Sequence, residues 1–166
     1  DVLTAAVLTV LEKAVGSFSQ MRVREGDSLK CDVLEKCGLI LDSVAFIEGR
    51  SEESVKAYRA RLEAKIKELL SDTSVDEQRL LTETAIFADK IAVDEETVRL
   101  KSHISQIKSL LSADEPIGRK LDFIVQEMNR ETNTIGSKCN DYEISKKVID
   151  MKSIIEKIRE QIQNIE

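Results

Sequence analysis

The sequence predicts an all-α protein in which long antiparallel helices form an elongated, oligomer-forming bundle. Only six glycines and one proline occur in 166 residues, which is too few for the turns of a many-stranded β protein. Apolar residues recur at spacings of three and four, which is the period of an amphipathic helix. Aromatic residues make up 4% of the chain, so we expect an aliphatic core.

The first predicted helix runs to about Glu48 and carries one long apolar stripe. At 1.5 Å per residue it would be about 70 Å long, so we expect it to pack on another long helix or on a partner chain. Gly49 followed by Ser51 to Ser54 is typical of a helix end and a new start. A second helix is therefore expected over 52–71. The stripe consists of Leu3, Val7, Val10, Ala14, Phe18, Met21, Leu29, Val33, Ile40, Val44 and Ile47.

A turn is expected at 71–74, and the next helix ends before a restart at Asp94. Pro116 cannot continue a helix, so it separates this restarted helix from the following one. A loop or kink at 136–141 precedes an isoleucine-rich last helix. We divide the chain into a long helical hairpin, 1–72, and a C-terminal helical domain, 73–166.

The charge and cysteine pattern excludes several classes of protein. The chain has 25 basic and 31 acidic residues, a net charge of −6, so a nucleic-acid site must be a local basic stripe. Three cysteines without C-x-x-C spacing indicate neither a disulfide framework nor a zinc knuckle. The uncharged stretch 2–11 is too short to span a bilayer. We expect a cytoplasmic protein that does not bind membranes.

Glu96, Arg99 and His103 follow one another at three and four residues, so they form one row on a helix. Such a row can hold a general acid or base that its neighbours orient. It can equally be a surface ion pair with a histidine beside it, and both interpretations stay open. Glu25 and Glu83 also lie on or beside apolar stripes, where a carboxylate needs a partner or solvent. Gly26, inside a predicted helix, suggests the close approach of another backbone or a ligand.

The segment 118–138 carries a ribbon of amides, hydroxyls and one carboxylate instead of the usual lysines and glutamates. Its members are Asp122, Gln126, Asn129, Asn133 and Ser137. Amides and hydroxyls bind sugars and base edges, and Arg119, Lys120, Arg130 and Lys138 can contact phosphates. A buried polar network between helices is the alternative. The sequence has no Gly-rich phosphate loop and no H-E-x-x-H motif, so a metal site would need carboxylates from different helices, which favour Mg²⁺ or Mn²⁺.

Several motifs, in this order, resemble the YicC/YloC family of stress-induced bacterial endoribonucleases. The resemblance covers the chain from about Arg24. It implies a cytoplasmic protein that cleaves RNA with a divalent cation and assembles as a homo-oligomer, expected as a hexamer. Full members carry a further N-terminal domain. The motifs are R-E-G-x-x-L-x-x-D (24–32), Y-R-x-R-L (58–62), D-E-x-R-L-x-x-E (76–83), A-D-K-x-x-x-x-E-E-x-x-R-L-x-S-H-I (88–104) and G-R-K-L-D-F-x-x-Q-E-M-N-R-E-x-N-T-I-G-S-K (118–138).

We therefore expect an endoribonuclease that hydrolyses RNA with the help of a divalent metal. Glu83, Asp122 and Glu127 would hold Mg²⁺ or Mn²⁺. His103 would act as general acid or base, and Arg99 and Arg130 would stabilise charge in the transition state. The residues expected to bind the RNA backbone are Arg22, Arg24, Arg119, Lys120, Asn129, Asn133 and Lys138.

Three alternatives stay open. In a metal-free route, the RNA 2′-OH attacks while His103 and one carboxylate move protons. In a second, the chain is a non-catalytic helical scaffold that binds RNA or a nuclease partner. In a third, it is an oligomerisation element without a ligand.

Overall fold

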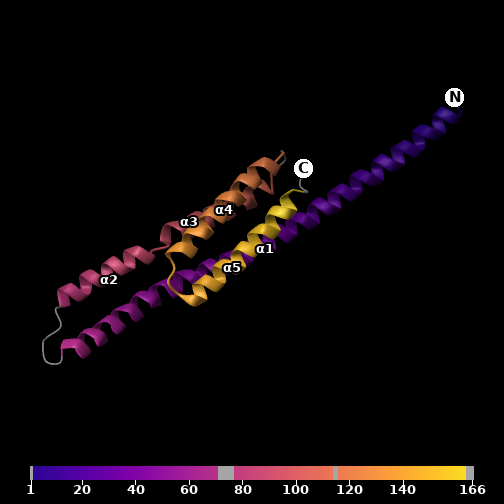
Figure 1. Cartoon of the computed structure of the whole chain (residues 1–166). Coiled ribbons are helices and arrows are strands. Elements are labelled where there is room, and N and C mark those ends of the chain that lie inside the picture. The colour runs from indigo at the N-terminus through magenta and orange to yellow at the C-terminus, as the bar shows by residue number, and fades with distance from the viewer. Residues whose placement is uncertain (1, 71–76, 114–115, 164–166) are drawn as a thin grey trace.

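The computed structural model describes residues 2–70, 77–113 and 116–163, and Figure 1 shows them as an elongated set of helices. No strand occurs in these three ranges, which confirms the predicted all-α class. The helices are α1 (Val2–Leu70), α2 (Glu77–Ile91), α3 (Asp94–Leu110), α4 (Gly118–Lys138) and α5 (Tyr142–Ile162).

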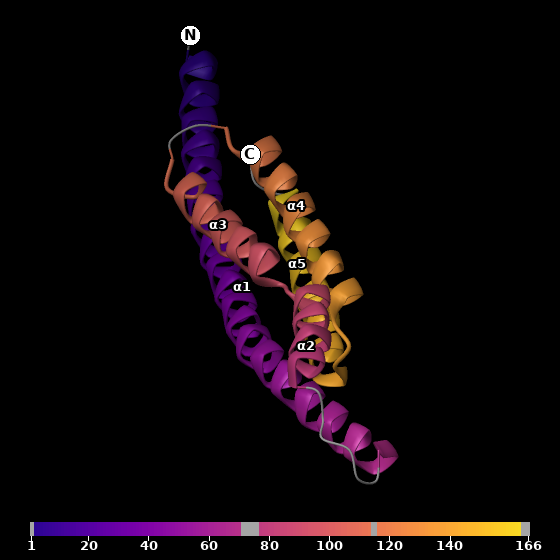
Figure 2. The ribbon, with the colours of Figure 1, turned by 90° about the vertical axis from the view of Figure 1, so that its left-hand side faces the viewer.

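Helix α1 is the long axis of the structure, and helices α2, α3 and α5 pack directly on it. Helix α4 packs against both α3 and α5. Figure 2 shows α2 continuing this layer along the C-terminal part of α1, while the N-terminal part extends past the other helices. An ion pair between Lys101 Nζ and Glu48 Oε1, 2.7 Å apart, joins α3 to α1. The hydrogen bond from Lys101 lowers the pKa of Glu48.

The core lies between the middle of α1 and helices α3, α4 and α5. Helix α1 contributes Val33, Ile40 and Ile47, which are fully buried at the spacing of the predicted stripe. Isoleucine, leucine, valine and methionine fill most of the remainder, and no aromatic side chain is buried among the described residues. The expected aliphatic core is therefore confirmed.

The first third of α1 is left uncovered by the rest of the chain, and residues 2–28 are exposed. This segment includes Leu3, Val7 and Val10, the last with 68% of its surface exposed. The predicted stripe is thus covered within the chain only from about Leu29 onward. By length and composition alone, a stretch near the start of α1 is apolar enough to cross a membrane.

The predicted break at Gly49 is wrong, because α1 is one helix from Val2 to Leu70. Ser54 donates its hydroxyl to the carbonyl of Arg50 one turn back, at 3.0 Å, so it does not cap a new helix. Beyond the glycine, the Tyr58 ring stacks on Phe87 of α2, with centroids 3.8 Å apart. Residues 2–70 therefore form one helix and not a helical hairpin. The division at residue 72 stays a prediction, and the turn expected at 71–74 lies outside the described residues.

We expect Gly49→Ala to stabilise the protein, since a Cβ at this position meets no atom within 4 Å. Alanine in a helix interior is better than glycine by about 1 kcal/mol, which raises Tm by about 2–4 °C in a domain of this size. Thermal unfolding followed by circular dichroism measures the change. The control is Gly136→Ala in α4, where a Cβ would lie 3.0 Å from Val148 Cγ1 of α5. A lower Tm for Gly49→Ala would contradict the continuous helix.

The remaining helix boundaries follow the predicted signals. Helix α3 begins at Asp94, as expected, and Pro116 lies just outside α4. The loop expected at 136–141 is shorter, because α4 continues to Lys138. Asp141 caps α5: its Oδ1 accepts the backbone N–H groups of Glu143 and Ile144 at 2.8 and 3.2 Å. Burial opposes ionisation of Asp141, but these bonds and Arg50 outweigh it and lower its pKa.

Candidate active site and nucleic-acid interface on helices α3 and α4

Two ion pairs join α3 and α4 along a line that we call the α3–α4 seam, formed by Glu96, Arg99, Glu131 and Lys138. Lys138 Nζ lies 2.8 Å from Glu96 Oε1, and Arg99 Nη1 lies 3.2 Å from Glu131 Oε1. Both carboxylates are buried, Glu96 with 4% of its surface exposed. Because the partner number falls on α4 as it rises on α3, the two helices run antiparallel.

The ion pairs of the seam favour the charged forms of Glu96 and Arg99. Burial opposes ionisation of Glu96, but the hydrogen bond from Lys138, the backbone bond and two nearby cations lower its pKa. The hydrogen bond to Glu131 raises the pKa of Arg99, which also pairs with Glu95. Arg99 was predicted to stabilise charge in the transition state and Lys138 to bind the RNA backbone, yet in this structure both are held by carboxylates of the chain. We therefore assign them to helix packing.

His103 lies on the same row of α3, one turn beyond Arg99. It is half-buried, and its Nδ1 is buried with no hydrogen-bond partner in the described part of the chain. One turn along each antiparallel helix from the Arg99–Glu131 pair brings His103 level with Glu127. Glu127 Oε2 lies 3.5 Å from Arg130 Nη1. The register of the seam therefore puts the imidazole of His103 at the level of the Glu127–Arg130 ion pair.

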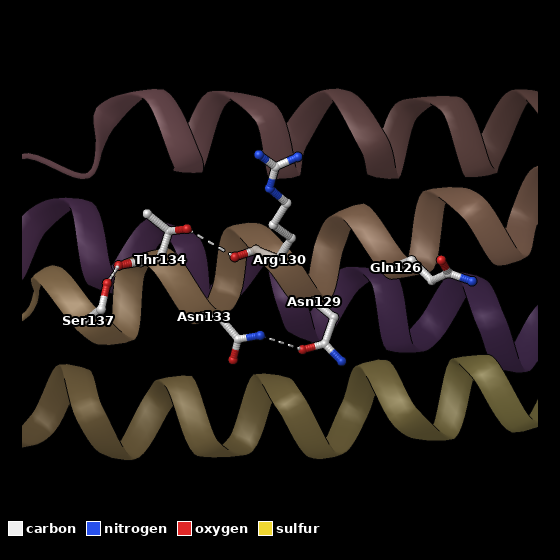
Figure 3. Close-up of a pocket in the computed structure, with 6 residues that line it drawn as sticks. All are labelled: Gln126, Asn129, Arg130, Asn133, Thr134 and Ser137. Atoms are coloured by element: carbon white, nitrogen blue, oxygen red, sulfur yellow. Dashed lines mark hydrogen bonds between the residues drawn. The ribbon is translucent and has the colours of Figure 1, made fainter.

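Beside this group, the outer face of α4 forms a shallow polar depression, drawn in Figure 3. Arg130 points toward α3, whereas Asn129 and Asn133 lie on the side of α5 and share a hydrogen bond of 3.2 Å. The ribbon predicted from the sequence is therefore at the surface, and the alternative of a buried interhelical network is wrong. Residues that line the depression are Gln126, Asn129, Arg130, Asn133, Thr134 and Ser137.

The three predicted metal ligands do not form one site in a single chain. Glu83 is exposed on α2, whereas Asp122 and Glu127 are both on α4. Their spacing of five residues turns them about 140° apart around the helix. Asp122 Oδ2 instead accepts a hydrogen bond from Gln126 Nε2 at 2.7 Å. Among the described residues, no three His, Cys, Asp or Glu side chains are grouped to hold a metal ion. The predicted ligand set is therefore wrong as a single-chain site.

The other predicted basic residues divide between two places. Arg119 and Lys120 are exposed in the first turn of α4. Arg22 lines a groove between α1 and the α3–α4 connection, with its guanidinium carbon 5.8 Å from the centre of the Phe18 ring. Arg24 is exposed on α1 and is not one of the groove residues. The groove also contains Gly26, but no atom comes within 4 Å of a Cβ built there, so the close approach expected at Gly26 does not occur among the described residues.

A cysteine nucleophile does not fit this arrangement. Burial raises the pKa of the Cys37 thiol to about 11, so it stays protonated and inert near neutral pH. Cys31 is exposed on α1, and Cys139 follows α4, neither on the row of His103.

The fold and this surface define an all-α protein with a half-buried histidine and a half-buried carboxylate beside an amide-rich face. The family model "Endoribonuclease YicC-like, C-terminal" matches residues 47–166. The chain belongs to this family, which confirms the resemblance seen in its motifs.

Two relatives carry the name "Probable endoribonuclease YicC". The protein of Clostridioides difficile is 48% identical over 167 residues, and that of Haemophilus influenzae is 33% identical over 168 residues. Each alignment covers 100% of this chain and 57% of the relative. The chain thus spans little more than half the length of these curated relatives.

Proposed function

We propose that this chain carries the reaction centre of an endoribonuclease, with His103, Glu127 and Arg130 as its reacting group. The family assignment supports the class of reaction. The observation that carries the proposal is the register of the α3–α4 seam, which puts His103 at the level of the Glu127–Arg130 ion pair, next to the polar depression. A phosphate bound at Arg130 would lie beside both groups that can move protons.

The chemistry that these groups support is attack by the RNA 2′-OH on the adjacent phosphorus. The Glu127 carboxylate accepts the 2′-OH proton, and the His103 imidazolium donates a proton to the leaving 5′ oxygen. The P–O5′ bond breaks as the P–O2′ bond forms, which gives a 2′,3′-cyclic phosphate and a free 5′-OH. Arg130 stabilises the extra negative charge on the phosphorus oxygens. Neutral amides along α4 bind sugars and base edges.

The dependence on Mg²⁺ or Mn²⁺ expected from the sequence is untested, and the proposed reaction does not require it. Because Glu83, Asp122 and Glu127 do not converge in one chain, we assign no step of the reaction to a cation held by them. A cation would need ligands from beyond the described residues, for example from a second copy of the chain.

Incubation of end-labelled single-stranded RNA with the chain, in excess EDTA or in Mn²⁺, tests this proposal. We expect cleavage to survive EDTA and to leave 2′,3′-cyclic phosphate ends, because none of the three reacting side chains needs a metal. Cleavage lost in EDTA and restored by Mn²⁺ would overturn the metal-free route. RNA that is bound but never cut would instead favour the non-catalytic scaffold.

The exposed start of α1 supports a proposal about assembly. Between residues 2 and 21, only Glu12 and Lys13 are charged, and apolar side chains point in several directions around the helix. A helix that is apolar on most sides is usually covered. We propose that a second copy of the chain supplies this cover in a cytoplasmic homo-oligomer. Sedimentation equilibrium measures the mass, and a monomer that binds lipid vesicles instead would contradict the proposal.

A further inference from the structure

Phe123 on α4 is exposed over 63% of its surface and packs in no part of the core. It is one of only four phenylalanines in the chain. Single exposed apolar residues are common on protein surfaces, so its exposure alone carries no weight. A role for Phe123 follows from its neighbours along the helix.

Phe123 belongs to a row of six residues spaced alternately by four and three, which lies on one side of α4. This row is opposite the buried stripe of Leu121, Ile124 and Met128, so it faces solvent. Its last four members line the polar depression. It spans about 27 Å at 1.5 Å per residue. The row consists of Arg119, Phe123, Gln126, Arg130, Asn133 and Ser137.

We propose that Phe123 stacks on an unpaired base, so that the substrate of this surface is single-stranded RNA. The inference rests on the proposed function. Every base presents a π-face to an aromatic ring, but in a duplex both faces are covered by neighbouring pairs. Phe123 lies about 6 Å along the helix from Glu127, or between one and two stacked nucleotides at about 3.4 Å each. A base on Phe123 would therefore hold the scissile phosphate beside the reacting group.

The surroundings of Phe123 favour RNA over a protein partner. The centre of a protein interface is depleted of charge and rich in apolar residues, whereas Phe123 has Arg119 and Lys120 within one turn and Gln126 as its next neighbour on the row. An aromatic ring placed among cations and amides is the composition of single-strand binding surfaces, where cations contact phosphates and rings contact bases.

The chain contains no tryptophan, so Phe123→Trp introduces a single fluorescent reporter at the proposed stacking position. We expect single-stranded RNA to quench its fluorescence on binding, and the same RNA annealed to its complement to leave it unchanged. Phe123→Ala should bind single-stranded RNA about 5- to 150-fold more weakly, the loss of one stacked base. Phe123→Leu should be weakened similarly, because it keeps the apolar bulk and loses the ring.

Ile86→Trp is the matched control, since Ile86 is an apolar residue exposed over 59% of its surface on α2, at the opposite end of the helical body from the start of α4 (Figure 1). Its fluorescence should not respond to RNA. Arg119→Gln should weaken single- and double-stranded binding alike, because it contacts phosphate. Two results would overturn the stacking proposal and leave the proposed function standing. One is unchanged fluorescence of the Phe123→Trp variant when it does bind RNA, and the other is a Phe123→Leu variant that binds RNA as tightly as the wild type. Absence of RNA binding by the wild-type chain overturns the proposed function and this inference together.

Discussion

His103→Ala is expected to lower the single-turnover rate of RNA cleavage by about 10²- to 10⁴-fold, the usual contribution of a positioned general acid or base. The affinity for RNA should stay near that of the wild type, because the imidazole is placed to move a proton and lies outside the exposed amide row. The fold should also survive. His103 makes no hydrogen bond through its buried Nδ1 among the described residues, so its removal leaves no new unpaired partner there.

Rate and affinity must be measured separately to test this. Glu127→Gln should lower the cleavage rate in the same way. In the double variant, the increase in activation free energy should be much smaller than the sum of the two single increases, since the two groups act in one step. Ser105→Ala, exposed on the same helix, is the matched control and should cleave normally. Equal cleavage rates for His103→Ala and wild type, with RNA still bound, would exclude His103 from the reacting group and place the reaction at other residues.

The periodic features of the fold could be predicted because a helix that is buried on one side carries apolar residues at spacings of three and four. The stripe through Val33, Ile40 and Ile47 is buried as expected. The break at Gly49 was wrong because capping preferences are worth about 1 kcal/mol each, and helix continuity with the contact between Tyr58 and Phe87 outweighs them. No local pattern reports that contact, which joins residues 29 positions apart.

The candidate site shows the same limit. The row of Glu96, Arg99 and His103 and the amide ribbon of α4 were both visible in the sequence, because each lies on one helix. Their pairing was not, since it depends on which helices become neighbours and in what register. The available signal was the position of Glu96 and Glu131 on otherwise apolar faces, where a buried carboxylate requires a cation. The predicted metal ligands Glu83, Asp122 and Glu127 failed for a related reason, because they were chosen without knowing how α2 and α4 are placed relative to each other.

Lys138→Met should destabilise the protein by about 3 kcal/mol at pH 7, the low end of the cost of leaving a buried charge without its partner. Glu96 already has one buried oxygen, Oε2, without a hydrogen bond in the described part of the chain, and Lys138 supplies the ion pair of the other, Oε1. For a domain of this size the loss corresponds to about 6–12 °C in Tm. Urea denaturation at pH 7 measures the free energy of unfolding directly.

The dependence on pH identifies Glu96 as the cause. In the wild type the pKa of Glu96 is lowered in the folded state, so its charge stabilises the fold above the unfolded pKa of about 4.3, and this stability is lost as pH falls through the lower folded value. Without Lys138, burial favours the protonated acid, so the folded pKa rises and the variant's deficit should shrink as the pH falls toward 4. Glu96→Gln in the Lys138→Met background removes the buried charge and should recover part of the stability at pH 7. A deficit that is independent of pH would mean that Lys138 acts through packing of its methylene chain and not through the Glu96 carboxylate.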